Sequence, residues 1–132
     1  MTQRKTIEEL NVLTDKVIGA AIQVHRALGP GLLENAYAQC LAIELSDRGL
    51  SAIREVGIPL LYKNVTLENT YRLDFLVEDT LIVECKAVEN LLPIHTAQVL
   101  TYLKLADKQL GLLLNFNVEV LHKGIKRIAN GI

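Results

Sequence analysis

Residues 71–87 read Tyr-Arg-Leu-Asp-Phe-Leu-Val-Glu-Asp-Thr-Leu-Ile-Val-Glu-Cys-Lys-Ala. Apolar and polar residues alternate in both halves of this segment, which predicts two β-strands. The polar triplet Glu78-Asp79-Thr80 between the halves is typical of a turn. We therefore predict a β-hairpin with a three-residue loop. Its apolar face would carry Leu73, Phe75, Val77, Leu81, Val83, Cys85 and Ala87.

A three-residue loop fixes which residues face one another across this hairpin. Val77 then lies opposite Leu81, and the same register places Asp74 opposite Glu84. Opposed side chains have Cβ atoms roughly 4.5–5.5 Å apart, where like charges destabilise a sheet. A divalent cation would remove the repulsion, because carboxylate and carbonyl oxygens are ligands that Mg²⁺ and Mn²⁺ prefer. A two-residue loop would instead place Asp74 opposite Cys85 and separate the carboxylates.

Lys86 projects from the same predicted face as Glu84. It could position or deprotonate a metal-bound water, or stabilise the charge of a scissile phosphate. The alternative is a solvated sheet surface on which Lys86 and Arg72, predicted to lie opposite each other, neutralise the two carboxylates. The register argument leaves these two interpretations about evenly balanced.

Composition limits the domain organisation and the location of the protein. The 132 residues suffice for one domain, residues 1–132, with its own core. The chain is 50% hydrophobic with a mean hydropathy of +0.25, and a buried homodimer interface would explain this excess. The longest apolar run is far shorter than the ~18 residues of a membrane span. Because the N-terminus is polar and charged, we also expect no signal peptide and a cytoplasmic location.

Charge and cysteine content exclude other classes of protein. The net charge is −1, so any nucleic acid must be held by a local patch rather than by overall charge. The aromatic content of 5%, without tryptophan, disfavours broad stacking on single-stranded bases. Two cysteines form neither a disulfide framework nor a zinc spacing. Cys85 is therefore predicted to be a core residue.

Three helices are predicted from apolar periodicity and from their end signals. The first starts after the Thr6/Glu9 capping box and ends at Gly29, as one helix or as two pieces broken near residues 11–14. The second runs from about 32 to 48, with Leu33, Tyr37, Cys40 or Leu41, and Leu45 on its apolar side. The third begins at Pro93 and runs to about 107. Its expected apolar stripe is Ile94, Ala97, Leu100 or Thr101, and Leu105, with His95, Gln98 and Tyr102 on a polar flank.

The remaining segments are predicted strands. Residues 52–58, 60–62 and 65–67 precede the hairpin, with Lys63-Asn64 as a tight turn. Residues 110–116 form an apolar run typical of a strand buried in the middle of a sheet. Residues 118–128 supply a last strand or turn and the basic residues His122, Lys123, Lys126 and Arg127, which are either solvated or a phosphate contact. This order predicts an α/β fold in which helices flank a central mixed sheet.

Several motifs resemble those of a known family. Gly31-Leu-Leu-Glu-Asn-Ala-Tyr37 fits the signature G-x-x-E-x-x-Y of the GxxExxY protein family, within the PD-(D/E)XK nuclease superfamily. The resemblance runs from about residue 13 to residue 127. It includes residues 17–25 and 28–31, the acidic hairpin, and residues 98–102, 114–116 and 124–127. No single motif is decisive, but together and in this order they are specific.

This resemblance implies a restriction-endonuclease-like core and a set of roles. Asp74 and Glu84, with the Cys85 carbonyl, look like the ligands of Mg²⁺ or Mn²⁺, and Lys86 looks like the catalytic lysine. Glu34 matches a helical glutamate that joins the metal site through water, and Gln98 a glutamine on the later core helix. Tyr37 and Tyr102 would support the site. Lys123, Lys126 and Arg127 are the candidates for nucleic-acid contact.

Two functions follow as expectations. The first is a metal-dependent nuclease that hydrolyses phosphodiester bonds, with DNA favoured as substrate and a homodimer presenting two sites. The second is a non-catalytic binding or assembly module built on the same fold, which the net charge of −1 supports.

Overall fold

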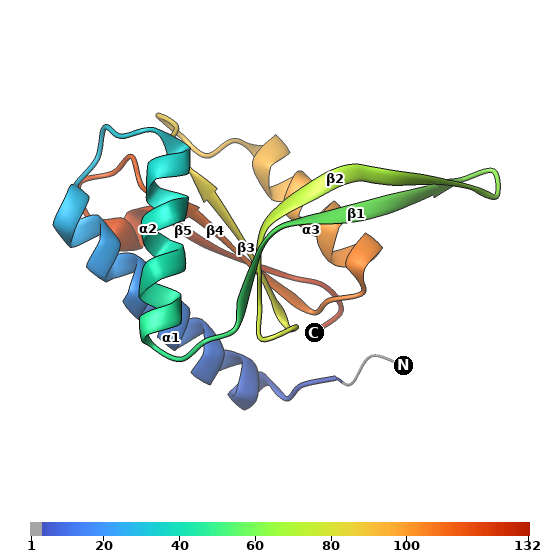
Figure 1. Ribbon diagram of the computed structural model, residues 1–132, viewed down its shortest axis with the longest axis horizontal. Coiled ribbons are helices and arrows are strands. Elements are labelled where there is room, and N and C mark those ends of the chain that lie inside the picture. The colour runs from blue at the N-terminus through green and yellow to red at the C-terminus, as the bar shows by residue number, and fades with distance from the viewer. Residues whose placement is uncertain (1–3) are drawn as a thin grey trace.

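A twisted mixed sheet with helices on both faces forms the body of the molecule (Figure 1). The computed structural model describes residues 4–132, and in this range the sheet has five strands in the order β1-β2-β3-β4-β5. The elements are α1 (Ile7–Leu28), α2 (Glu34–Asp47), β1 (Ala52–Tyr62), β2 (Val65–Val77), β3 (Leu81–Lys86), α3 (Pro93–Ala106), β4 (Leu110–Asn115), the 3₁₀ turn η1 (Leu121–Gly124) and β5 (Ile125–Ala129). The predicted α/β architecture with a central mixed sheet is confirmed.

The sheet is mixed because α3 crosses over between two parallel strands. β3 and β4 pair in parallel from Leu81–Leu110 to Lys86–Asn115, whereas the other neighbouring strands are antiparallel. Every residue of β4 is buried, as its continuous apolar sequence predicts for a central strand. Within residues 4–132, no helix is long and apolar enough to cross a membrane.

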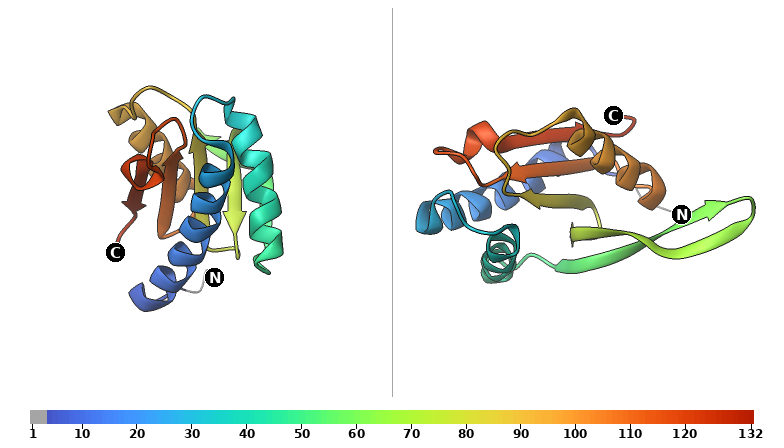
Figure 2. Two further views of the ribbon diagram at one scale, coloured as in Figure 1. Left: turned by 90° about the vertical axis from the view of Figure 1, so that its left-hand side faces the viewer. Right: turned by 90° about the horizontal axis from the view of Figure 1, so that it is seen from above.

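The helices α1 and α2 cover one face of the sheet, and α3 covers the other (Figure 2). α1 is a single helix with the predicted capping box: the Glu9 N–H donates to Thr6 Oγ1 at 3.1 Å, and the Thr6 N–H donates to Glu9 Oε1 at 3.0 Å. α1 and α2 share a core with the sheet residues Phe75, Val83 and Cys85. The prediction that Cys85 is a core residue is therefore confirmed.

Four predicted apolar positions on the helices were wrong. Leu33 precedes α2 as its N-cap and is 82% exposed. On α3, the predicted stripe fails because Ile94, Ala97 and Leu105 are exposed, whereas Val99 and Leu103 are buried. α3 is apolar around most of its circumference, so periodicity does not single out one face. Its buried face is instead set by the sheet, since Val99 packs into the space that a side chain at Gly111 would fill.

β1 and β2 continue into a long arm that projects beyond the body of the sheet (Figure 1). The separate strands predicted before the hairpin are two continuous strands, with a register shift at Pro59 between Ile58 and Leu60. The tight turn at Lys63-Asn64 is confirmed, and both residues have positive φ as a two-residue hairpin turn requires. We call residues 60–70 the arm; every residue from 61 to 70 in it is exposed.

Candidate active site

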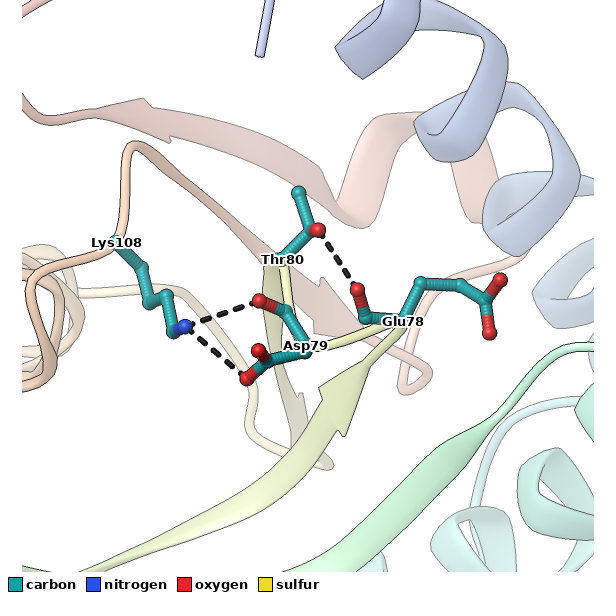
Figure 3. Close-up of polar contacts among 4 residues, drawn as sticks. All are labelled: Glu78, Asp79, Thr80 and Lys108. Atoms are coloured by element: carbon teal, nitrogen blue, oxygen red, sulfur yellow. Dashed lines mark hydrogen bonds and ion pairs between the residues drawn. The ribbon is translucent and has the colours of Figure 1, made fainter. Parts of the chain in front are cut away.

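The turn between β2 and β3 sets the geometry of the candidate site (Figure 3). The Thr80 hydroxyl donates to the Glu78 carbonyl at 2.7 Å, and the Thr80 N–H donates to the Val77 carbonyl at 3.0 Å. Lys108 Nζ, from the loop after α3, donates to the Asp79 carbonyl at 2.9 Å and pairs with Asp79 Oδ1 at 3.1 Å. These contacts fix a three-residue loop. The predicted register is confirmed, because Val77 pairs with Leu81.

Beyond this turn the two strands separate, and the carboxylates take the place of the strand-to-strand hydrogen bonds. Regular pairing between β2 and β3 ends at Phe75 and Val83. The Asp74 N–H then donates to Glu84 Oε2 at 2.6 Å, and the Cys85 N–H donates to Asp74 Oδ2 at 2.8 Å. Each carboxylate thus accepts a backbone N–H from the opposite strand. This arrangement holds the two acidic groups beside each other.

The same separation overturns two expectations for the hairpin. Arg72 does not face Lys86; it pairs with Gly57 on β1 and is exposed. Leu73 leaves the apolar face shared by Phe75 and packs with the core beneath α3. Both differences arise because β2 turns away from β3 at Asp74 and follows β1 into the arm. A solvated face neutralised by Arg72 is therefore not what the structure forms.

The environment of Glu84 favours its protonated form. Glu84 is only 5% exposed, and burial together with the charge of Asp74 raises the pKa of its carboxyl from 4.5 to about 8. Burial also raises the pKa of Asp74, although the Cys85 N–H and the cations Lys86 and Arg54 oppose this shift. Two carboxylates this close cannot both ionise easily without a compensating cation. The pair therefore has the electrostatic character of a cation-binding site.

The oxygen atoms around this pair suit a hard divalent cation. The Lys86 carbonyl accepts from the Phe116 N–H at 2.9 Å, so the backbone groups of Lys86 point toward β4. The backbone N–H and carbonyl groups of consecutive residues in a strand point to opposite sides of it. Those of Cys85 therefore point toward β2 and Asp74. In the described part of the chain, no three His, Cys, Asp or Glu side chains gather into a possible metal site. The available donors are two carboxylates and one carbonyl, a set that fits Mg²⁺ or Mn²⁺.

The Lys86 side chain lies on the same side of β3 as Glu84. It is half-buried, and its charge lowers the pKa of both Asp74 and Glu84. Across residues 4–132 it forms no ion pair within 4.0 Å. Lys86 is therefore close to both carboxylates but forms an ion pair with neither.

The remaining predicted site residues fall into near and remote groups. Glu34 opens α2, and its charge contributes to the raised pKa of Glu84. Tyr102 is half-buried on α3. Burial is the main cause of the raised pKa of its hydroxyl, and the negative charges of Glu84 and Asp74 raise this pKa further. Gln98 is exposed on the same helix, and its predicted role stays a prediction.

Tyr37 fixes the loop that leads into α2. Its ring is fully buried and stacks on Phe116 with centroids 4.6 Å apart. Its hydroxyl donates to the Gly29 carbonyl at 2.6 Å and accepts the Leu32 N–H at 3.1 Å. The spacing between Glu34 and Tyr37 therefore has a structural meaning, because Tyr37 anchors the segment that carries Glu34.

The predicted basic cluster near the C-terminus is not a single patch. Lys126 and Arg127 alternate on β5, where Ile125 packs in the α1 side core and Ile128 in the α3 side core. Arg127 reaches α1, where it donates to Thr14 Oγ1 at 3.1 Å and to Asn11 Oδ1 at 2.6 Å. Lys123 and Lys126 are exposed. Arg127 thus has a structural partner, and nucleic-acid contact by the two lysines stays a prediction.

One residue near the carboxylates was missed by the sequence analysis. Arg54, on β1, lowers the pKa of Asp74 and lines an open pocket together with Glu34 and Asp74. No local motif marks it. Its position depends on the pairing of β1 with β2, and hence on the register shift at Pro59.

The fold and site define an α/β domain with an acidic pair and a lysine on adjacent central strands. A family model described as the PD-(D/E)XK nuclease superfamily matches residues 11–128. The chain therefore belongs to the PD-(D/E)XK nuclease superfamily. No curated protein and no solved structure gives a significant match to it.

The pH dependence of stability tests the environment of Glu84. Because its pKa is raised in the folded protein, the native state binds more protons than the unfolded state between pH 4.5 and about 8. Without divalent metal, we expect the free energy of unfolding to fall as the pH rises through this window. The contribution of Glu84 is at most about 1.4 kcal/mol per pH unit. Urea unfolding in EDTA from pH 5 to pH 8.5 measures it.

Glu84→Gln is the control for this experiment, since glutamine keeps the shape of the side chain but does not titrate. Its free energy of unfolding should depend less steeply on pH than that of the wild type. Parallel curves for the two proteins would contradict the raised pKa.

Proposed function

We propose that this protein is a metal-dependent nuclease that hydrolyses phosphodiester bonds in nucleic acid, with DNA as the favoured substrate. The observation that carries the proposal is the pairing of Asp74 and Glu84 where β2 and β3 separate, with Lys86 on the same side. Burial of two adjacent carboxylates is costly unless a positive charge compensates them, and a bound cation is the simplest source of that charge. Membership of a nuclease superfamily supports the same function. We further propose, from the G-x-x-E-x-x-Y signature at residues 31–37, that the chain is a member of the GxxExxY family.

In this proposal Asp74, Glu84 and the Cys85 carbonyl hold Mg²⁺ or Mn²⁺. When bound, such an ion supplies an activated water and polarises the phosphate. Glu84 releases its proton when the site is filled, because a carboxylate binds a cation only in its ionised form. The cost of burying two adjacent carboxylates is then offset.

The other residues act on the phosphate and on ordered water. Lys86 donates hydrogen bonds to the phosphate oxygen on which negative charge develops during hydrolysis. Glu34 and Gln98 accept hydrogen bonds from water and orient it. Tyr102 lines the α3 side of the carboxylates, and Tyr37 holds the loop before Glu34.

Metal titration tests the site without any assumption about the substrate. We expect calorimetry to show Mn²⁺ or Mg²⁺ binding to the wild type, with an affinity that Glu84→Gln lowers at least about tenfold, or about 1.4 kcal/mol. Glu119→Gln, which neutralises an exposed carboxylate outside the pocket that Asp74 lines, is the matched control and should leave the affinity unchanged. Equal affinities for the wild type and Glu84→Gln would contradict the proposed site.

A cleavage screen then identifies the substrate. The wild type is incubated with linear duplex DNA, a four-way junction, single-stranded DNA and the corresponding RNAs, with Mg²⁺, Mn²⁺ or EDTA. We expect cleavage of at least one substrate, with DNA preferred, that EDTA abolishes. Cleavage that persists in EDTA would contradict the metal dependence, and cleavage of none of the substrates would contradict the nuclease function.

A second candidate is a non-catalytic binding or assembly module, which the arm favours. Leu61, Tyr62 and Val65 are more than half exposed there, an arrangement typical of a protein contact. We propose that the protein is cytoplasmic and that it forms a homodimer through this surface. An interface remote from Asp74 is compatible with the nuclease, whereas one that covers Asp74 favours the module.

A further inference from the structure

Arg54 combines a cation with an unpartnered buried donor beside the proposed metal site. Its guanidinium carbon lies 5.3 Å from the centroid of the Phe75 ring, so the planar group rests on an aromatic face. Its Nε atom is buried and has no hydrogen-bond partner. Over the described range 4–132, Arg54 also forms no ion pair within 4.0 Å.

The Arg54 guanidinium therefore lacks the hydrogen-bond acceptor that its buried Nε–H requires. The contact with the Phe75 ring does not provide one. The geometry of the guanidinium fork matches a phosphate or a carboxylate, each of which accepts two parallel hydrogen bonds.

An open pocket of about 190 Å³ lies in front of this arginine. It is lined by Glu34, Asn35, Ala38, Arg54, Glu55 and Asp74. In a regular strand the consecutive residues Arg54 and Glu55 would point to opposite faces. Glu55 has a left-handed φ of 55°, which lets both residues border the same pocket. A non-glycine residue in this conformation is strained, and such strain is concentrated at functional sites.

We propose that Arg54 is a phosphate-binding residue that positions a nucleic-acid strand next to the Asp74–Glu84 pair. This inference rests on the proposed function, because it assigns a second phosphate contact to the same substrate. The strand would enter between the first turn of α2 and the start of β1. One phosphate of its backbone would accept hydrogen bonds from the Arg54 fork while the neighbouring, scissile phosphate lies at Asp74.

The carboxylates of the pocket determine when this contact forms. Asp74 shares the pocket and is close enough for Arg54 to lower its pKa, while Glu34 and Glu55 are exposed and hydrated. In the absence of a divalent ion, the negative charge of these groups opposes a phosphate. Once a cation compensates Asp74 and Glu84, less negative charge opposes the phosphate, and the positive charge of Arg54 can attract it. Phosphate binding by Arg54 is therefore expected to require a divalent ion.

The test measures binding without cleavage. Fluorescein-labelled duplex DNA, four-way junction and single strand are titrated with protein in Ca²⁺ or in EDTA, and anisotropy is followed over a range of salt concentrations. Arg54→Met keeps the stem that packs on Phe75 but removes the charge. It should weaken binding about tenfold in Ca²⁺ and lower the salt slope by about one. Arg54→Lys should keep the slope and recover only part of the affinity.

Two further measurements separate a binding role from a structural one. Lys104→Met removes an exposed charge from α3 and should bind like the wild type. Thermal melting establishes that Arg54→Met is folded at the assay temperature. Where the wild type cleaves the probe, Arg54→Met should raise KM while kcat changes by less than about threefold, as expected for loss of a contact made before the reaction.

Each outcome decides between the proposals. Equal affinity and equal salt slope for Arg54→Met and the wild type overturn the role of Arg54, even where the wild type cleaves. If Arg54→Met is unfolded, equal affinity of Arg54→Lys and the wild type overturns it. Binding that depends on Arg54 without cleavage by the wild type supports this inference and contradicts the nuclease function. A wild type that binds none of the probes overturns both.

Discussion

Lys86→Ala is expected to lower the rate of phosphodiester cleavage about 100- to 1,000-fold while the protein stays folded. The ammonium group lies beside the two carboxylates that we propose as metal ligands, without an ion pair of its own in the described structure. It is therefore free to stabilise the charge that develops on the phosphate, and its loss removes a contact made mainly in the transition state. Asp74→Ala and Glu84→Ala should abolish cleavage, since each removes a proposed metal ligand. Single-turnover cleavage measures all three variants.

The controls distinguish loss of chemistry from loss of fold. Lys104→Ala removes an exposed lysine of α3 and should leave the rate unchanged. Lys86→Arg keeps the charge and should retain part of the activity. A Lys86→Ala variant that is as active as the wild type would contradict the proposed role. Retained activity in all three alanine variants would exclude this site.

Tyr37→Ala is expected to have the largest effect on stability, about 3–5 kcal/mol. The side chain is fully buried, stacks on Phe116 and joins two backbone groups of the loop before α2. Truncation leaves a cavity between α2 and Phe116 and releases that loop. Tyr37→Phe should keep the stacking but leave the Gly29 carbonyl and the Leu32 N–H without their partner, at a cost of about 1–3 kcal/mol. Urea denaturation measures both changes.

Tyr62→Phe is the matched control, because Tyr62 lies on the exposed arm. Its free energy of unfolding should stay within about 0.5 kcal/mol of the wild-type value. If Tyr37→Phe proved equally neutral, the hydroxyl would not anchor the loop. The spacing between Glu34 and Tyr37 would then need another explanation.

The part of the site that could be predicted from sequence is the part governed by local turn chemistry. Glu78-Asp79-Thr80 is short and polar, and a three-residue loop leaves one register, so the approach of Asp74 to Glu84 follows by counting. The separation of the strands after Phe75 could not be counted in this way. It depends on where β2 leaves β3 while it stays paired with β1, which is a property of the whole sheet.

Arg54 and α3 show why other features escaped prediction. Counting back from the Lys63-Asn64 turn would place Arg54 opposite Leu73, but the irregularity at Pro59 moves its partner to Phe75. Nothing in the local sequence specifies the size of that shift. The buried face of α3 was mispredicted for a similar reason. A helix that is apolar on most sides takes its orientation from the surface it meets, here the space above Gly111.

The arm and Asp74 belong to one strand, and this has a mechanical consequence. Regular backbone pairing joins β2 to β3 only from Phe75–Val83 to Val77–Leu81, close to the turn, and the hydrogen bonds of the Asp74 and Glu84 carboxylates follow it. In contrast, β3 and β4 are paired from Leu81–Leu110 to Lys86–Asn115. β2 is therefore anchored to the central strands near the turn, and its far end forms the arm (Figure 1). Glu84 lies on the central strand β3, whereas Asp74 lies on the strand that extends into the arm. We therefore expect a load on the tip of the arm to reach the site through Asp74.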